Sequence, residues 1–284
     1  MNEAAFVRRK LQGRIMFALC AACAGLAVTV LFLILGYIAY HGFANLNWSF
    51  FTRLPKPVGE TGGGIANAIV GSAKVVGLGG FIGVPIGVLA GLWLAEFGDN
   101  RLGFAVRYAA DVLNGVPSII VGLFAYSLVV IPLKHFSALS GSLALAFIVV
   151  PIVLRNTEEF VRLVPHSLRE AALALGVPQW KVVLRVILPT ASKGILTGAL
   201  LALSRVAGET APLIFTAFGN RFWDGGWMQP IATLPMAIFT YAISPYDDWH
   251  RQAWAAALVL MLFVLSVNVA ARIFLKPSHG DAHG

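Results

Sequence analysis

Four charged side chains lie inside long apolar stretches of this sequence. Arg155 and Glu158 stand three residues apart near the end of one stretch, and Arg205 and Glu209 stand four apart within another. A charge at mid-membrane costs about 2.5–3.5 kcal/mol on insertion scales, so such residues are candidates for function. An arginine can hold an oxyanion through two parallel hydrogen bonds, and a nearby glutamate can weaken that grip enough for release. Thr210 adds a hydroxyl beside Glu209.

The same charges also allow a purely structural interpretation. Residues four apart share one face of a helix, so Arg205 with Glu209, and Arg155 with Glu158 or Glu159, could form salt bridges that only brace the bundle. The spacing does not choose between a brace and an anion path. An intramembrane enzyme with Glu158 or Glu209 as its base is disfavoured, because no histidine or cysteine lies near these residues in the sequence.

The elements that must position these charges are membrane-spanning helices. Of the 284 residues, 58% are hydrophobic and 12% are charged, whereas about a quarter of the residues of a soluble domain are charged. Apolar runs of 18 or more residues indicate transmembrane helices. Six are expected, at about 15–40, 65–96, 108–132, 138–160, 194–218 and 252–274. The predicted fold class is therefore all-α, a polytopic membrane protein.

The distribution of basic residues predicts the orientation of these spans. Of the 21 lysines and arginines, 13 fall in segments expected inside, five in segments expected outside, and three within spans, namely Lys74, Arg155 and Arg205. Because basic residues gather in cytoplasmic loops, both termini should be cytoplasmic. The net charge of +8 is thereby explained without nucleic acid. Lys74 either reaches a vestibule or extends to the interface, and its role stays open.

Two patterns concern packing within the spans. Cys20 and Cys23 lie in the first apolar run, where small buried filler is a better interpretation of C-x-x-C than metal or redox chemistry. Glycines recur every four residues in the second run and should let a neighbouring helix approach closely. These glycines are Gly79, Gly83, Gly87 and Gly91.

One long stretch that is neither an apolar run nor a tail covers residues 165–189. It reads as two short helices joined by a turn. Ser167 and Glu170 have the spacing of a capping box, and Gly176 suits the left-handed end of a helix. Pro178 suits the first turn of a second helix, which Pro189 should close.

This stretch resembles the EAA loop of binding-protein-dependent ABC importer permeases. Val186 stands where that family usually has isoleucine, and the other motif positions are in register. They are Glu170, Ala171, Ala172, Gly176, Leu188 and Pro189. The resemblance implies a cytoplasmic loop, at about 161–193, that docks on an ATPase subunit. The alternative is an amphipathic interfacial hairpin without a partner.

Further segments resemble the PstA-type permeases of phosphate importers. They are Gly63-Gly64-Ile65, Asn67 to Gly71, Gly115 to Phe124, Leu154 to Glu158, and Ser204 to Phe218. The resemblance implies the type I ABC importer permease fold. It also implies that Arg155, Glu158, Arg205 and Glu209, with Thr210 beside them, form part of a phosphate path.

The resemblance also predicts an organisation and a set of partners. Residues 1–64 would hold the tail, first span and outer loop, residues 65–276 the permease core, and residues 277–284 a tail. Expected partners are a PstC-type permease, a PstB-type ATPase dimer, a PstS-type extracytoplasmic phosphate-binding protein and the lipid of a bacterial cytoplasmic (inner) membrane.

No phosphate-loop motif is present, so this chain should be a transport subunit and not an enzyme. ATP and Mg²⁺ would bind the partner ATPase, and no cofactor or metal is expected here. Transport of phosphonate, sulfate or molybdate is the main alternative, and a passive channel would leave the EAA loop without a purpose.

Overall fold

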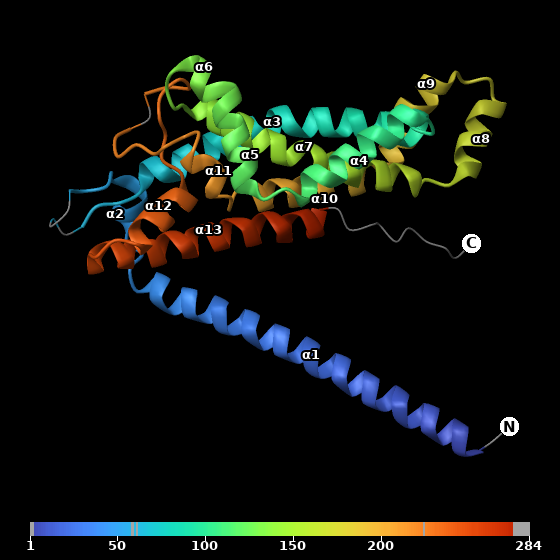
Figure 1. The fold of residues 1–284 in the computed structure, drawn as a ribbon, viewed down its shortest axis with the longest axis horizontal. Coiled ribbons are helices and arrows are strands. Elements are labelled where there is room, and N and C mark those ends of the chain that lie inside the picture. The colour runs from blue at the N-terminus through green and yellow to red at the C-terminus, as the bar shows by residue number, and fades with distance from the viewer. Residues whose placement is uncertain (1–2, 58–59, 61, 224, 275–284) are drawn as a thin grey trace.

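The computed structural model describes residues 3–57, 60, 62–223 and 225–274, and these residues form helices and connecting loops (Figure 1). In the first half of the chain the helices are α1 (Glu3–Phe43), α2 (Trp48–Thr52), α3 (Ala66–Phe97), α4 (Arg101–Gly115), α5 (Ser118–Ala125), the π-helical η1 (Tyr126–Val130) and α6 (Ile131–Leu133). The second half forms α7 (Ala138–Arg162), α8 (His166–Ala174), α9 (Gln179–Val182), the π-helical η2 (Val183–Ile187), α10 (Leu188–Val206), α11 (Ala211–Ile214), α12 (Leu234–Ala242) and α13 (Asp247–Phe274). Lys276 and the predicted tail at 277–284 lie outside the described residues.

Within the described residues, five helices are long and apolar enough to cross a membrane, and a bent pair of helices makes a sixth span if the pair is counted as one. The five are α1, α3, α7, α9–α10 and α13, and the bent pair is α4 with the helix from Ser118 to Leu133. The third span was expected to be one continuous helix at 108–132. This was wrong, because the two helices of the bent pair meet at an angle of 107°. Pro117 disfavours helical geometry at Val116 and so accounts for the break.

The core of the bundle is the contact between α3 and α7, which lie side by side (Figure 1). The glycine stripe of α3 faces α7, as predicted. A Cβ added to Gly83 would lie 2.9 Å from Val149 Cβ, and one added to Gly91 would lie 2.5 Å from the carbonyl oxygen of Leu154. Only hydrogen fits at these positions, so the two backbones approach closely.

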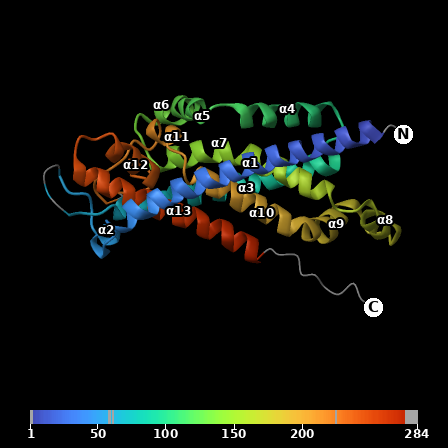
Figure 2. The ribbon, with the colours of Figure 1, turned by 90° about the horizontal axis from the view of Figure 1, so that it is seen from below.

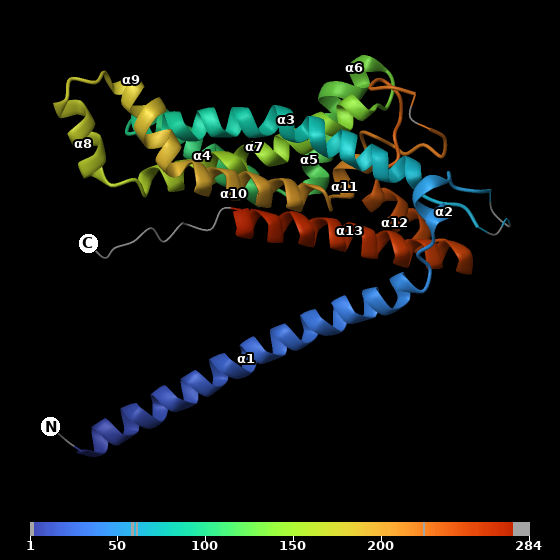
Figure 3. The ribbon, with the colours of Figure 1, turned by 180° about the vertical axis from the view of Figure 1, so that it is seen from behind.

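Helix α1 leans away from the bundle along most of its length (Figures 1 and 3). It meets α13 near its own end, where Gly42 lies against Leu258 and the Tyr37 ring packs edge-on against Trp254. Cys20 and Cys23 are exposed on the part that leans away. Their prediction as buried filler was therefore wrong for this chain, because no described helix covers that part of α1.

The segment between α11 and α13 was expected to be an outer loop, but much of it folds against the bundle. Ser72 on α3 accepts a hydrogen bond from the backbone N–H of Leu234 at 2.7 Å, and the Asn67 amide donates to the Asn220 carbonyl oxygen at 2.7 Å. The Lys74 ammonium lies 5.6 Å from the centre of the Trp227 ring. A cap formed by α12 and these connections thus covers one end of the bundle.

The two ends of the bundle differ in what they carry. α8 and α9 lie at one end, together with the start of α1 and the end of α13, and α2, α6 and α12 lie at the other (Figures 1 and 2). The chain therefore crosses between these ends as a six-span topology requires. Both described chain ends lie on the side of the EAA loop.

Two π-helical segments interrupt the α-helical pattern, and each ends two residues before a proline. η1 is followed by Pro132 and η2 by Pro189. A proline ring would clash with the carbonyl four residues earlier in an α-helix, which is Leu128 or Arg185 in these segments. The wider π turn relieves this clash, so the helix continues. The prediction that Pro189 closes a helix was therefore wrong.

Candidate functional site

The fifth span positions Arg205 and Glu209 differently from the prediction. Helix α10 ends at Val206, and Glu209 lies in the connection before α11. The two residues are therefore not one turn apart on a helix, and the expected span at 194–218 is a helix that begins and ends earlier. No hydrogen bond or ion pair joins the two side chains, and neither pairs with another described residue.

Arg205 and Glu209 line one cavity of about 660 Å³ together with the break in the bent span. Arg205 is exposed and Glu209 is half-buried. The backbone around Pro117 and Ser118 faces them across this space. The cavity thus holds an unpaired guanidinium, an unpaired carboxylate and the start of α5, whose first N–H groups lack helical partners. Most of its remaining lining is apolar, from α4, α5 and α7.

Ser118 is the first residue of α5, directly after the break in the bent span. The structure places it well inside, because α4 begins at Arg101. The hydroxyl of Thr210, which was grouped with the path, caps no helix, and Thr210 does not line this cavity. The Pro117 break could have been read from the sequence, since proline restricts the residue before it.

Arg155 and Glu158 belong to a second cluster, which lines a separate cavity of about 430 Å³. The Glu158 side chain is 4% exposed and bonds to three arginines: Arg107 at 2.5 Å, Arg155 at 2.7 Å and Arg162 at 3.2 Å. Arg155 also pairs with Asp111 at 2.9 Å. These ion pairs join α4 to α7, as the bracing interpretation of Arg155 and Glu158 expected.

The sequence analysis did not identify Arg107 and Arg162 as part of this cluster. Arg162 stands four residues after Glu158 on α7, a spacing that indicates a helical ion pair. Arg107 also donates to the carbonyl oxygens of Leu94 and Gly98, both at 3.0 Å. It thereby holds the end of α3 to α4, while its ion pair with Glu158 joins positions 51 residues apart, a contact that no local pattern predicts.

Residues 165–189, the coupling hairpin, form the short helix α8, as predicted, and then the start of a longer helix that runs from Gln179 to Val206. Helix α8 begins at His166 and has no side-chain cap, so the proposed capping box of Ser167 and Glu170 is not formed. Pro165 is the N-cap, and the helix begins at His166, which leaves Ser167 inside the first turn. Gly176 has a φ of 76°, the predicted left-handed turn.

The surface of the coupling hairpin is exposed around its motif residues. Glu170, Ala171, Gly176 and Pro189 are exposed, and Ala172 and Leu188 are half-buried. Leu175 and Trp180 are also exposed, by 84% and 60%. Exposed apolar side chains of this size, grouped on one short segment, mark an interaction surface.

Comparison with known sequences identifies the family. Residues 83–276 match the family described as binding-protein-dependent transport system inner membrane component. A permease from Xylella fastidiosa (strain Temecula1 / ATCC 700964), named phosphate transport system permease protein PstA, is 51% identical over 236 residues, 82% of each chain. The protein of that name from Haemophilus influenzae is 44% identical over 272 residues, 95% of this chain and 96% of its own.

The chain belongs to the PstA permease family. This permease is therefore a multi-pass membrane protein and an inner-membrane component of a binding-protein-dependent transport system, as the sequence analysis predicted.

Solved structures agree on the fold of this permease. A chain of the inward-facing MetNI methionine ABC transporter aligns with a TM-score of 0.62, at 17% identity, over 75% of this chain and 96% of its own. A chain of a bacterial ABC transporter for the polysaccharide alginate aligns with a TM-score of 0.61, at 14% identity, over 95% and 99%. The predicted type I importer permease fold is confirmed.

Proposed function

We propose that this permease is half of the membrane pore of an ATP-driven importer that carries inorganic phosphate into the cell. The names of its relatives support phosphate as the cargo. The structural observation that carries the proposal is the unpaired Arg205 in its cavity beside the break in the bent span. A guanidinium that no carboxylate neutralises can bind an oxyanion through two hydrogen bonds, and the partial positive charge at the start of α5 favours the same anion.

The partners follow from the same proposal. A PstC-type permease completes the pore, a PstS-type binding protein delivers phosphate at the end capped by α12, and a PstB-type ATPase dimer docks on the coupling hairpin. The contact residues would be Glu170, Ala171, Ala172, Gly176, Leu188 and Pro189. Both termini are then cytoplasmic, because the start of α1 and the end of α13 lie at the end of the bundle that carries this hairpin.

Glu158 and its three arginines occupy a different place on the proposed path. Arg155 is engaged by Asp111 and Glu158, so it has fewer free donors for phosphate than Arg205. We assign this cluster to the cytoplasmic end of the path, where rearranged ion pairs release the anion. Arg205 then binds the phosphate anion, and the negative charge of Glu209 repels the anion and keeps this binding weak.

Phosphate uptake by the reconstituted importer, with sulfate and molybdate as competitors, tests the cargo. Arg205→Gln, alone and with Glu209→Gln, tests the residue. Both variants should lose uptake while the complex assembles, whereas Lys193→Gln, which removes a charge from α10 outside the cavity, should retain it. Near-normal uptake by the double variant would refute the role of Arg205. Inhibition by sulfate equal to that by unlabelled phosphate would refute the cargo.

A further inference from the structure

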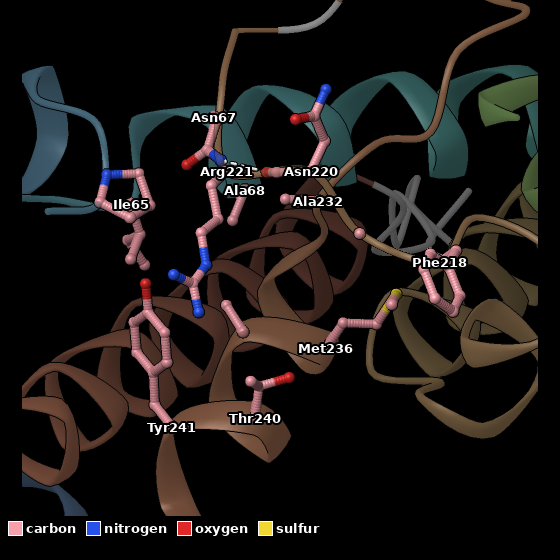
Figure 4. Close-up of a pocket in the computed structure, with 13 residues that line it drawn as sticks. Ile65, Asn67, Ala68, Phe218, Asn220, Arg221, Ala232, Met236, Thr240 and Tyr241 are labelled. Carbon is pink, nitrogen blue, oxygen red and sulfur yellow. Dashed lines mark hydrogen bonds between the residues drawn. The ribbon is translucent and has the colours of Figure 1, made fainter. Parts of the chain in front are cut away.

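A separate cavity of about 220 Å³ lies at the capped end of the bundle, away from Arg205. Its lining comes from the start of α3, the segment that follows Phe218, and α12. Figure 4 shows the Arg221 side chain reaching into the space between Asn67 and Tyr241. The described residues that line this cavity include one cation and no carboxylate. Its volume is several times the roughly 30 Å³ of one liquid water, so a five-atom oxyanion fits.

Two hydrogen-bond donors in this cavity are unused. The Arg221 guanidinium lies 5.3 Å from the centre of the Trp249 ring and has no hydrogen bond or ion pair with any described residue. Tyr241 is 7% exposed, yet its hydroxyl has no described partner either. The Arg221 side chain is exposed, whereas Tyr241 is largely buried, and the hydroxyl of a buried tyrosine usually has a hydrogen-bond partner. The pair therefore has the character of a site prepared for a ligand that accepts hydrogen bonds.

The packing around Tyr241 fixes the direction of its hydroxyl. Its ring centre lies 4.8 Å from that of Trp249, the same ring that Arg221 covers, so one tryptophan positions both donors. Burial raises the pKa of Tyr241 above its usual 10.0, and the charge of Arg221 partly offsets this rise. The phenol therefore stays protonated at neutral pH and donates a hydrogen bond. The exposed Thr240 adds a second hydroxyl to the lining.

We propose that Arg221, Tyr241 and Thr240 form an oxyanion site at the outer mouth of this permease. Arg221 supplies the charge, and the two hydroxyls supply neutral donors that hold the anion without trapping it. This inference rests on the proposed function for its direction: phosphate leaving the binding protein would occupy this site before it reaches the cavity of Arg205. The headgroup of a phospholipid presents the same phosphate chemistry, so the test must separate the two sources.

The test measures how fast phenylglyoxal modifies Arg221 in the purified importer complex, by mass spectrometry of the peptide that contains it. Arg251 is the internal control, because it is 61% exposed near this end of the bundle and pairs with Asp248. In detergent without phospholipid or binding protein, inorganic phosphate should slow modification of Arg221 but not of Arg251. Tyr241→Phe removes only the hydroxyl and should raise the half-protecting phosphate concentration about fivefold, the value of one hydrogen bond.

Further conditions of the same experiment identify the source of the anion that protects Arg221. Protection of Arg221 in phosphatidylglycerol nanodiscs without added phosphate would assign the same oxyanion site to a lipid headgroup. Protection by the phosphate-free binding protein alone would overturn the proposal, because Arg221 would then be a docking contact. Equal protection of Arg221 and Arg251 by phosphate would also overturn it. So would a Tyr241→Phe variant whose half-protecting phosphate concentration equals that of the wild type. If the wild-type complex does not take up phosphate, the proposed function is refuted. The oxyanion site would still stand if phosphate protects Arg221.

Discussion

Among the described residues, one ion pair joins the coupling hairpin to the core of the permease. Arg169 on α8 reaches Glu96 at the end of α3 through two contacts, Nη2 to Oε1 at 2.7 Å and Nη1 to Oε2 at 2.9 Å. Nη2 also donates to the carbonyl oxygen of Val161 at the end of α7, at 3.3 Å. The two side chains are 19% and 3% exposed. We therefore expect this contact to carry movement from the docked ATPase to the two central helices.

Glu96→Gln tests this expectation. Glutamine keeps one acceptor but loses the charge and the second contact, and a hydrogen bond to a charged group contributes about 1.5–3 kcal/mol. We expect the free energy that holds the hairpin against the core to fall by about 2 kcal/mol. The loss is not larger because water can still solvate Arg169. That free energy corresponds to about a thirtyfold rise in the population in which α8 is detached. Amide hydrogen exchange in α8 should accelerate by a similar factor, and phosphate uptake per ATP hydrolysed should fall.

The matched control removes a charge from the hairpin without breaking an ion pair. Arg185 in η2 is exposed and makes no described ion pair, so Arg185→Gln should leave exchange in α8 unchanged. Reversing both charges, with Glu96→Arg and Arg169→Glu together, should restore part of the coupling. Unchanged exchange in α8 of the Glu96→Gln variant, or equal coupling in it and the Arg185→Gln variant, would refute the reasoning.

Three further outcomes are expected. Gly176→Val should weaken ATPase recruitment, measured by copurification, because valine disfavours a φ of 76°; wild-type recruitment would contradict this. Gly91→Leu should destabilise the permease by more than about 2 kcal/mol, measured by thermal unfolding in detergent, because its Cβ would lie 2.5 Å from a carbonyl oxygen. Gly77→Leu on the same helix meets nothing within 4 Å and should be tolerated; equal losses would argue against the packing account. In cells lacking Cys20 and Cys23, an impermeant thiol reagent should label Met228→Cys from outside and miss Leu175→Cys, and the reverse pattern would overturn the orientation.

Much of the architecture could be predicted because membranes restrict the chain to a few patterns. Apolar length identified the spans, and the four-residue spacing of the glycines identified the face of α3 that meets α7. Gly176 was predicted correctly because a left-handed turn strongly favours glycine. Each of these signals is local, so the sequence carries it directly.

The predictions that failed depended on how breaks in helices are accommodated. Pro189 was taken as a helix end, but the π segment before it lets the helix continue. Glu209 was placed on the face of Arg205 by counting turns, yet the helix ends at Val206. The ion pair between Arg169 and Glu96 spans 73 residues of sequence, and the donors of the outer cavity come from both the segment after Phe218 and α12, which no local pattern brings together.

The π segment η2 preserves the angular relation between the two ends of the fifth span. A π turn holds one more residue than an α turn, and it takes up that residue within a single turn. Deleting one residue between Val183 and Ile187 would therefore close the turn to α-helical geometry and rotate the coupling hairpin little relative to the face that carries Arg205. The Pro189 ring would then meet a carbonyl oxygen of the preceding turn, so the deletion would kink the helix at this point. A one-residue deletion in the regular part of α10 between Pro189 and Arg205 would instead rotate the coupling hairpin by about 100° relative to Arg205.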